Sequence, residues 1–137
     1  MEVIMSRSTG CSLRIRVAWM LVLAIAGFGS VSRAETWVPS ARSPYGTAYS
    51  YDADSLKREG SSVTAWIRGV YATGGFEKAR SRYNCGRRAV TTLSSATYRA
   101  DGSLENNFTW TDRQQTELPV LKGTYAEKIL LAVCSRK

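Results

Sequence analysis

Five cations within eleven residues are the part of this sequence best suited to chemistry. We call them the basic cluster: Lys78, Arg80, Arg82, Arg87 and Arg88. In an extended strand, alternate residues share a face, so the first three are expected to project together. Ammonium and guanidinium groups at such spacing hold anionic oxygens through charge-assisted hydrogen bonds. The cluster therefore predicts an anion-binding surface, and the alternative is a solvated strand that uses charge to resist edge pairing.

Residues for catalysis are scarce in this chain. It contains no histidine, the residue most often used for proton transfer near neutral pH and a common zinc ligand. Asp52 and Asp54 form the nearest carboxylate pair, but two carboxylates supply too few oxygens for calcium, and we expect one of them to cap a short turn. No activated nucleophile can be assembled. We expect a protein that is not an enzyme and has no cofactor or metal.

The first 34 residues are typical of an export signal. A charged start is followed by an uncharged apolar run from Val17 to Phe28 and by small residues at Ser32 and Ala34. The positive charges come from Arg7, Arg14 and Arg16. Cleavage between Ala34 and Glu35 would leave a periplasmic or secreted protein with no transmembrane segment. An uncleaved anchor is the alternative, but the run is shorter than the ~20 residues that span a bilayer.

The mature chain would keep 103 of the 137 residues, which is the size of one small domain. Arg33 and the three signal arginines leave together with Glu2, so the net charge falls from +8 to +5. A moderately basic domain favours acidic partners. Outside the cytoplasm these are an envelope or host protein, an anionic glycan or a lipid headgroup, and we expect no nucleic acid.

Two cysteines remain after signal removal, because Cys11 lies within the signal. An exported chain with one pair, Cys85 and Cys134, predicts one disulfide. It would close a loop of 49 residues, worth about 4 kcal/mol at most in the chain-entropy estimate. Two buried thiols are the alternative.

Period-two patterns bounded by turn residues predict an antiparallel meander of about six strands. The expected strands are Thr36–Val38, Thr47–Tyr51, Ser62–Tyr71, Glu77–Cys85, Ala89–Tyr98 and Leu104–Trp110. The third shows the clearest alternation, with Val63, Ala65 and Ile67 opposite Trp66 and Arg68. The aromatic residues of the expected strands would be core residues or cross-strand pairs or, less commonly, a ligand platform; they are Trp37, Trp66, Tyr71, Tyr83, Phe108 and Trp110.

The pattern near the C-terminus changes to a helical period. Thr124 followed by Glu127 fits a capping box at a helix start. An apolar stripe of Ala126, Ile129, Leu130, Val133 and Cys134 follows. Cys134 on this stripe and Cys85 at a strand end would tie the helix to the sheet. We therefore expect an α+β domain with the helix on one sheet face and the other face open.

The order of these landmarks resembles the surface-adhesin protein E family of bacterial exported proteins. The similarity runs from Trp37-Val38 through Ala48-Tyr49-Ser50-Tyr51-Asp52 and Val63-Thr64-Ala65-Trp66-Ile67, and then to Tyr83-Asn84-Cys85, Tyr98 with Gly102, and Leu130-Leu131-Ala132-Val133-Cys134. It implies a small α+β domain in residues 35–137 with a helix tied to the sheet by Cys85 and Cys134. The member that gives the family its name is displayed on the outer membrane and binds host matrix and serum proteins.

The sequence is compatible with two classes of function. The first is a non-enzymatic envelope binding module, similar to an adhesin, that uses the open sheet face and the basic cluster. The second is a structural subunit that assembles with itself, for example as a homodimer, through an exposed strand edge or sheet face.

Overall fold

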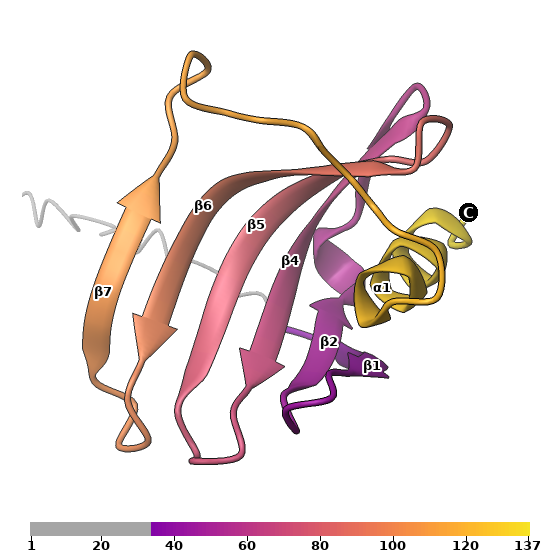
Figure 1. Ribbon diagram of the computed structural model, residues 1–137. Helices are drawn as coiled ribbons and strands as arrows, with labels where there is room; N and C mark the ends of the chain where they lie inside the picture. The colour runs from indigo at the N-terminus through magenta and orange to yellow at the C-terminus, as the bar shows by residue number, and fades with distance from the viewer. Residues whose placement is uncertain (1–33) are drawn as a thin grey trace, which may run out of the picture. The chain divides into compact units, whose positions relative to one another are not determined.

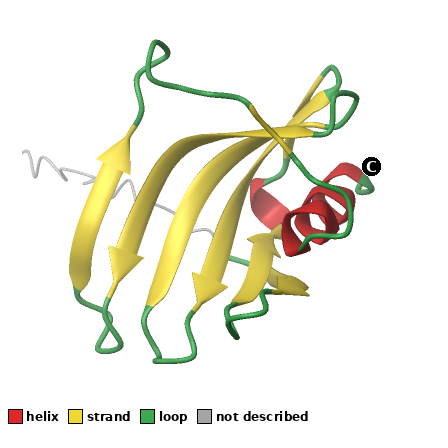
Figure 2. Cartoon of the chain, in the orientation of Figure 1, coloured by secondary structure: helices red, strands yellow, loops and turns green. Residues whose placement is uncertain are grey.

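The computed structural model describes residues 34–137, so most of the predicted export signal lies outside the described residues. These residues form one antiparallel sheet and a helix near the C-terminus (Figures 1 and 2). The strands are β1 (Trp37–Arg42), β2 (Ala48–Asp52), β3 (Lys57–Glu59), β4 (Ser62–Val70), β5 (Phe76–Asn84), β6 (Ala89–Tyr98), β7 (Leu104–Thr109) and β8 (Leu118–Pro119). The helical elements are a 3-10 turn, η1 (Ala53–Ser55), and the helix α1 (Tyr125–Cys134).

The predicted meander is confirmed. The main strand order is β1-β2-β4-β5-β6-β7, with antiparallel pairing throughout. The sequence pattern did not predict two short strands. Arg58 and Glu59 lie between the second and third expected strands and belong to β3, which pairs with the start of β4, and β8 pairs with β6. Both are too short to show a period of two.

Strand β1 extends further than its sequence predicted, from Trp37 to Arg42. Pro39 interrupts the pattern because proline has no amide donor. It is tolerated here because β1 lies at the edge of the sheet and has a neighbouring strand on one side only. A bulge between Pro39 and Ala41 accompanies it.

Glycines in left-handed conformations close two of the predicted turns. Gly46 ends the turn between β1 and β2 with φ 85°, and Gly102 lies in the β6–β7 hairpin with φ 84°. In the hairpin the Arg99 amide donates to the Ser103 carbonyl at 2.9 Å. These backbone values favour glycine, so the sequence placed both turns correctly.

The core lies between α1 and one face of the sheet. Val133 is fully buried, and Leu130 and Ile129 also face the sheet. They pack against the buried members of β2, β4 and β5, namely Tyr51, Val63, Ala65, Ile67 and Tyr83. Helix α1 lies near the β1, β2 and β4 end of the sheet, and β7 lies at the far end (Figure 1). The helix therefore covers only part of its own sheet face.

The start of α1 forms a variant of the predicted capping box. Thr124 is the N-cap, and its hydroxyl accepts a hydrogen bond from the Glu127 amide at 3.3 Å. The Glu127 carboxylate reaches one residue further back than in the standard box and accepts from the Gly123 amide at 2.6 Å. Glu127 also pairs with Arg88 of the β5–β6 turn. The helix start is thus bound to the sheet as well as capped.

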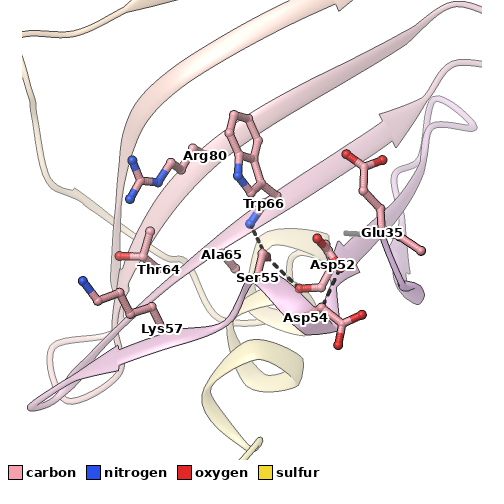
Figure 3. Close-up of a pocket in the computed structure, with 10 residues that line it drawn as sticks. Glu35, Asp52, Asp54, Ser55, Lys57, Thr64, Ala65, Trp66 and Arg80 are labelled. Atoms are coloured by element: carbon pink, nitrogen blue, oxygen red, sulfur yellow. Dashed lines mark hydrogen bonds between the residues drawn. The ribbon is translucent and has the colours of Figure 1, made fainter. Parts of the chain in front are cut away.

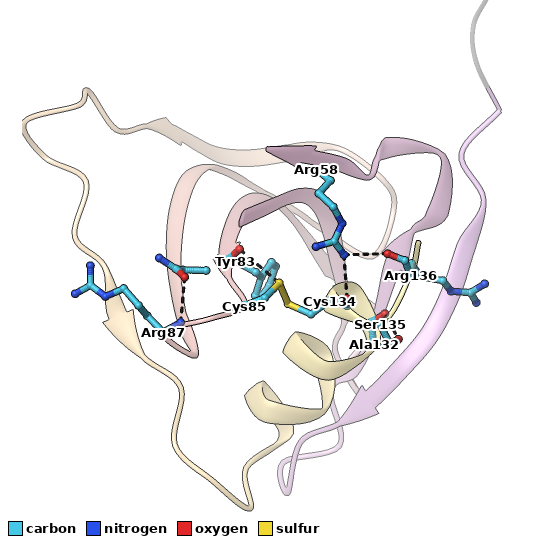
Figure 4. The surroundings of a disulfide bond; sticks show 9 residues. Arg58, Tyr83, Cys85, Arg87, Ala132, Cys134, Ser135 and Arg136 are labelled. Atoms are coloured by element: carbon cyan, nitrogen blue, oxygen red, sulfur yellow. Dashed lines mark hydrogen bonds between the residues drawn. A yellow bond between two sulfur atoms is a disulfide. The ribbon is translucent and has the colours of Figure 1, made fainter. Parts of the chain in front are cut away.

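A disulfide between Cys85 and Cys134 fastens the other end of the helix, as predicted (Figure 4). Two further contacts lie beside it. Arg58 of β3 donates to the carbonyls of Cys134 and Arg136, both at 2.9 Å. Arg136 in turn donates to the Tyr51 hydroxyl at 2.8 Å. The C-terminal turn is therefore held covalently and by hydrogen bonds.

Candidate binding site on the open face

The face of the sheet opposite α1, which we call the open face, carries a row of polar and aromatic side chains. Strand register fixes their arrangement because residues paired across antiparallel strands share a face. In the pairing of β4 with β5, Thr64 faces Arg82, Trp66 faces Arg80 and Arg68 faces Lys78. The neighbouring core-facing residues, such as Ala65 and Ile67, are buried on the other side. Trp66 remains 37% exposed.

The structure brings together three members of the basic cluster and separates the other two. Lys78, Arg80 and Arg82 alternate along β5 on the open face. Arg87 and Arg88 lie in the β5–β6 turn, where Arg87 pairs with Glu117 at 3.4 Å and Arg88 pairs with Glu127. Arg88 also has φ 52°, a left-handed conformation that is uncommon outside glycine. These two cations therefore stabilise the turn and the helix start.

Lys78 is occupied by a contact that sequence reasoning missed. Its ammonium donates to both carboxylate oxygens of Glu35, at 2.8 and 2.9 Å. This hydrogen bond is the main reason that the pKa of Glu35 lies below its usual range. Lys78 also lies 5.4 Å from the ring centre of Trp37, and Arg68 lies 4.7 Å from the same centre. No sequence pattern joins positions 35 and 78, because the antiparallel fold alone brings them together.

Arg80 and Arg82 are the members of the basic cluster that keep their capacity for a ligand. The Arg80 side chain makes no hydrogen bond or ion pair within residues 34–137. Arg82 donates to the side-chain oxygen of Gln115 at 3.1 Å, which is a neutral partner. Neither charge is compensated by a carboxylate in direct contact. An anion reaching this part of the sheet would meet two guanidinium groups.

Two cavities meet at Trp66 and Arg80. The first, of about 450 Å³, is also lined by Glu35, Asp52, Asp54 and Lys57. Figure 3 shows Trp66 between Arg80 on one side and the three carboxylates on the other. The second, of about 460 Å³, extends over Arg82 to Ser94, Thr109 and Trp110. Both volumes fall within the range of small-ligand sites.

The acidic side chains of the first cavity are engaged in structure. Asp52 is the predicted cap of the short turn, and it accepts from the amides of Asp54 at 3.1 Å and Thr36 at 2.9 Å. Asp54 accepts from the Thr36 hydroxyl at 2.5 Å. Within residues 34–137 no group of three or more potential ligands is arranged to hold a metal ion. The two aspartates therefore organise the entry of the chain into β1.

The loop between β7 and β8 forms the far wall of the second cavity and carries no periodic sequence signal. The Trp110 amide donates to the Leu93 carbonyl of β6 at 3.0 Å. The Gln115 side-chain amide donates to the Trp110 carbonyl at 3.3 Å and to Asp112 at 3.2 Å. The loop is thus fixed by internal bonds. Only the structure reveals that it belongs to the site.

These observations define a class of protein: a small α+β domain whose C-terminal helix is joined by a disulfide to one face of an antiparallel meander. The sequence pattern described as surface-adhesin protein E matches residues 37–135. The chain belongs to the surface-adhesin protein E family, a family of exported surface proteins. A search of the curated proteins finds no match.

A solved structure shares this fold. The crystal structure of Haemophilus influenzae protein E superposes with a TM-score of 0.50, covering 70% of this chain and 87% of that chain at 12% identity. At this identity the likeness supports the fold alone. Within residues 34–137, the structure has no helix that is long and apolar enough to cross a membrane.

Proposed function

We propose that this chain is a non-enzymatic, exported protein of the bacterial envelope whose open sheet face binds an anionic group on its partner. The observation that carries the proposal is the uncompensated pair Arg80 and Arg82 beside the exposed indole of Trp66. Family membership supports an adhesin-like role. Cleavage between Ala34 and Glu35 would release the domain, which begins about where the family pattern begins, into the periplasm or the medium.

The position of Glu35 is compatible with that cleavage. Its side chain bonds to Lys78 and accepts from the Trp37 indole at 3.1 Å, so a chain that starts at Glu35 keeps the contacts that hold β1. Fractionation of the native cells and intact-mass measurement test this part. A mass starting at Glu35 and lacking two hydrogens supports it, whereas an uncleaved or lipid-modified mass in a membrane fraction contradicts it.

Charge reversal tests the binding proposal. The R80E/R82E double variant changes the open face, and K122E/K137E makes the same change in net charge at exposed positions after β8 and at the C-terminus. The probes are phosphatidylglycerol vesicles, a polyuronate tetrasaccharide and solubilised envelope proteins. Loss of binding to any probe in the first variant alone, with a weaker salt dependence, supports the proposal. Equal losses in both variants would show that only net charge matters.

A second candidate is a self-assembling envelope subunit, favoured by the exposure of β7. Every residue of this edge strand is exposed, including Leu104 and Phe108. Edge strands of this kind can pair with another chain. Sedimentation of the purified domain over a range of concentrations separates the candidates, because a concentration-independent monomer contradicts self-assembly.

A further inference from the structure

We infer that the anionic ligand of the open face is an acidic saccharide, bound with its sugar ring against Trp66 and Trp110 and its acidic group on Arg80 and Arg82. The inference rests on the proposed function and adds the chemical class of the ligand. Three features support it: the shape of the site, the charges that remain available, and the placement of aromatic and hydroxyl groups.

The shape of the site suits an extended ligand. The cavity over Arg82 has a volume of about 460 Å³, and it shares Trp66 and Arg80 with the neighbouring cavity of about 450 Å³. The two cavities therefore adjoin along the sheet surface. An oligomer can place one unit over Arg82 and the next beyond Trp66, whereas a compact ion would occupy only a fraction of this space.

The cavity over Arg82 has a net positive charge, because Arg80 and Arg82 outnumber its one carboxylate, Asp112. In the neighbouring cavity Glu35 is paired with Lys78 at 2.8 Å, while Asp52 and Asp54 accept hydrogen bonds from neutral groups of Thr36 and have no ion pair within residues 34–137, so that cavity adds no positive charge. The Arg80 side chain has no bonding partner within residues 34–137, and Arg82 has only the neutral amide of Gln115. A carboxylate or sulfate can therefore form charge-assisted, two-pronged hydrogen bonds with a guanidinium group here. Charge complementarity thus selects an acidic rather than a neutral or basic ligand.

The indole groups of the site offer a flat apolar surface. A sugar ring can pack on such a surface, whereas a simple anion gains no contact from it. Trp66 is 37% exposed, and Trp110 is supported from its side by Phe108, with ring centres 4.6 Å apart and planes at 64°. A pyranose ring presents an apolar face of C–H groups that packs flat on an aromatic ring. An isolated phosphate or a lipid headgroup would use the guanidinium groups and gain nothing from the indoles.

Hydroxyl and amide groups complete the lining beside the cations. Ser94 lies opposite both Arg80 and Thr109 in the strand register, and both hydroxyl-bearing residues line the same cavity as Arg80. Gln115 also lines this cavity, and so does the carboxylate of Asp112, which accepts from the Gln115 side-chain amide at 3.2 Å. These groups can donate to or accept from sugar hydroxyls, and a small number of such groups fixes the orientation of a ligand in its pocket. The combination of flat apolar, cationic and hydrogen-bonding groups matches an acidic sugar.

Calorimetry and tryptophan fluorescence with defined probes test the inference on the full domain. A polyuronate tetrasaccharide is compared with a neutral glucose tetrasaccharide, inorganic phosphate and phosphatidylglycerol vesicles. The variants are R80Q, W66A and W66L, of which the last keeps apolar bulk without a flat ring. We expect the polyuronate to bind and to change the tryptophan emission. Each variant should weaken that binding by about tenfold, equivalent to about 1.4 kcal/mol.

The outcomes separate this inference from the proposed function. Loss of polyuronate binding in both W66L and R80Q, with no binding of the neutral saccharide, supports the saccharide. Phosphate or vesicle binding that needs Arg80 but is unchanged in W66A and W66L overturns the saccharide and leaves an anion-binding face. Failure of all four probes to bind wild-type protein overturns the inference, while binding of solubilised envelope proteins through Arg80 and Arg82 would still sustain the proposed function.

Discussion

Trp66 of β4 and Arg80 of β5 lie directly opposite each other in the antiparallel register, and both line the two cavities of the open face. The indole is partly exposed and the guanidinium group has no anionic partner within residues 34–137. This pair is therefore the centre of the candidate site.

The pairing predicts an asymmetry in fluorescence quenching. A cation beside an exposed indole raises the local concentration of anions. Iodide should therefore quench Trp66 more strongly than caesium does. The R80E variant should reduce iodide quenching in the wild-type background but have little effect in a W66F background. The same change in both backgrounds would show that Arg80 acts on Trp37 or Trp110 instead.

The disulfide predicts a large contribution to stability. Reduction, or the C85S/C134S double variant, releases a 49-residue loop in the unfolded chain. The free energy of unfolding should fall by about 4 kcal/mol at most. Urea denaturation under reducing and non-reducing conditions measures the difference. Equal midpoints in the two conditions would contradict a stabilising bond.

Adjacent leucines of α1 should respond very differently to truncation. Leu130 is 2% exposed in the core and Leu131 is 50% exposed. L130A should lower the free energy of unfolding by about 2–5 kcal/mol because it leaves a cavity. L131A is the matched control and should change it by about 0.5 kcal/mol or less. Similar losses in urea denaturation would contradict the burial of Leu130 against the sheet.

Gly69 of β4 is expected to resist substitution because of a neighbouring ring. A Cβ at this position would lie 2.8 Å from a ring carbon of Tyr49, and that ring is stacked on Tyr125 at 5.2 Å. Since the ring is held in place, G69A should cost about 1–3 kcal/mol of stability. The control G86A meets no atom closer than 3.8 Å and should be tolerated. Thermal denaturation of both variants compares them.

Protonation of Glu127 should account for part of the loss of folding stability at acid pH. The hydrogen bond from the Gly123 amide, and then the one from Arg88, hold the pKa of Glu127 below its usual value of 4.5. Because the folded-state pKa is lowered, its contribution to stability is complete above about pH 4.5 and is lost as the pH falls through the lowered value. E127Q should be less stable at neutral pH and lose less stability on acidification. Parallel pH profiles of the melting temperature would contradict this.

The sequence determined the six longer strands, the helix and the residues that share a face. These features depend on local rules: alternation along β4 and β5, left-handed glycine at Gly46 and Gly102, and the cap at Thr124. The pairing of Cys85 with Cys134 also followed, because only two cysteines remain after the predicted signal. Short strands such as β3 lacked enough residues to show a pattern.

Only the tertiary structure decided which charges are available. The basic cluster is uniform in sequence, but chain folding places Glu35 on Lys78, Glu117 on Arg87 and Glu127 on Arg88. Arg80 and Arg82 remain without carboxylate partners, and the β7–β8 loop brings Trp110 and Gln115 beside them. These contacts join residues that are distant in the chain. Local periodicity carries no information about such partners, because they depend on how the strands and loops pack in three dimensions.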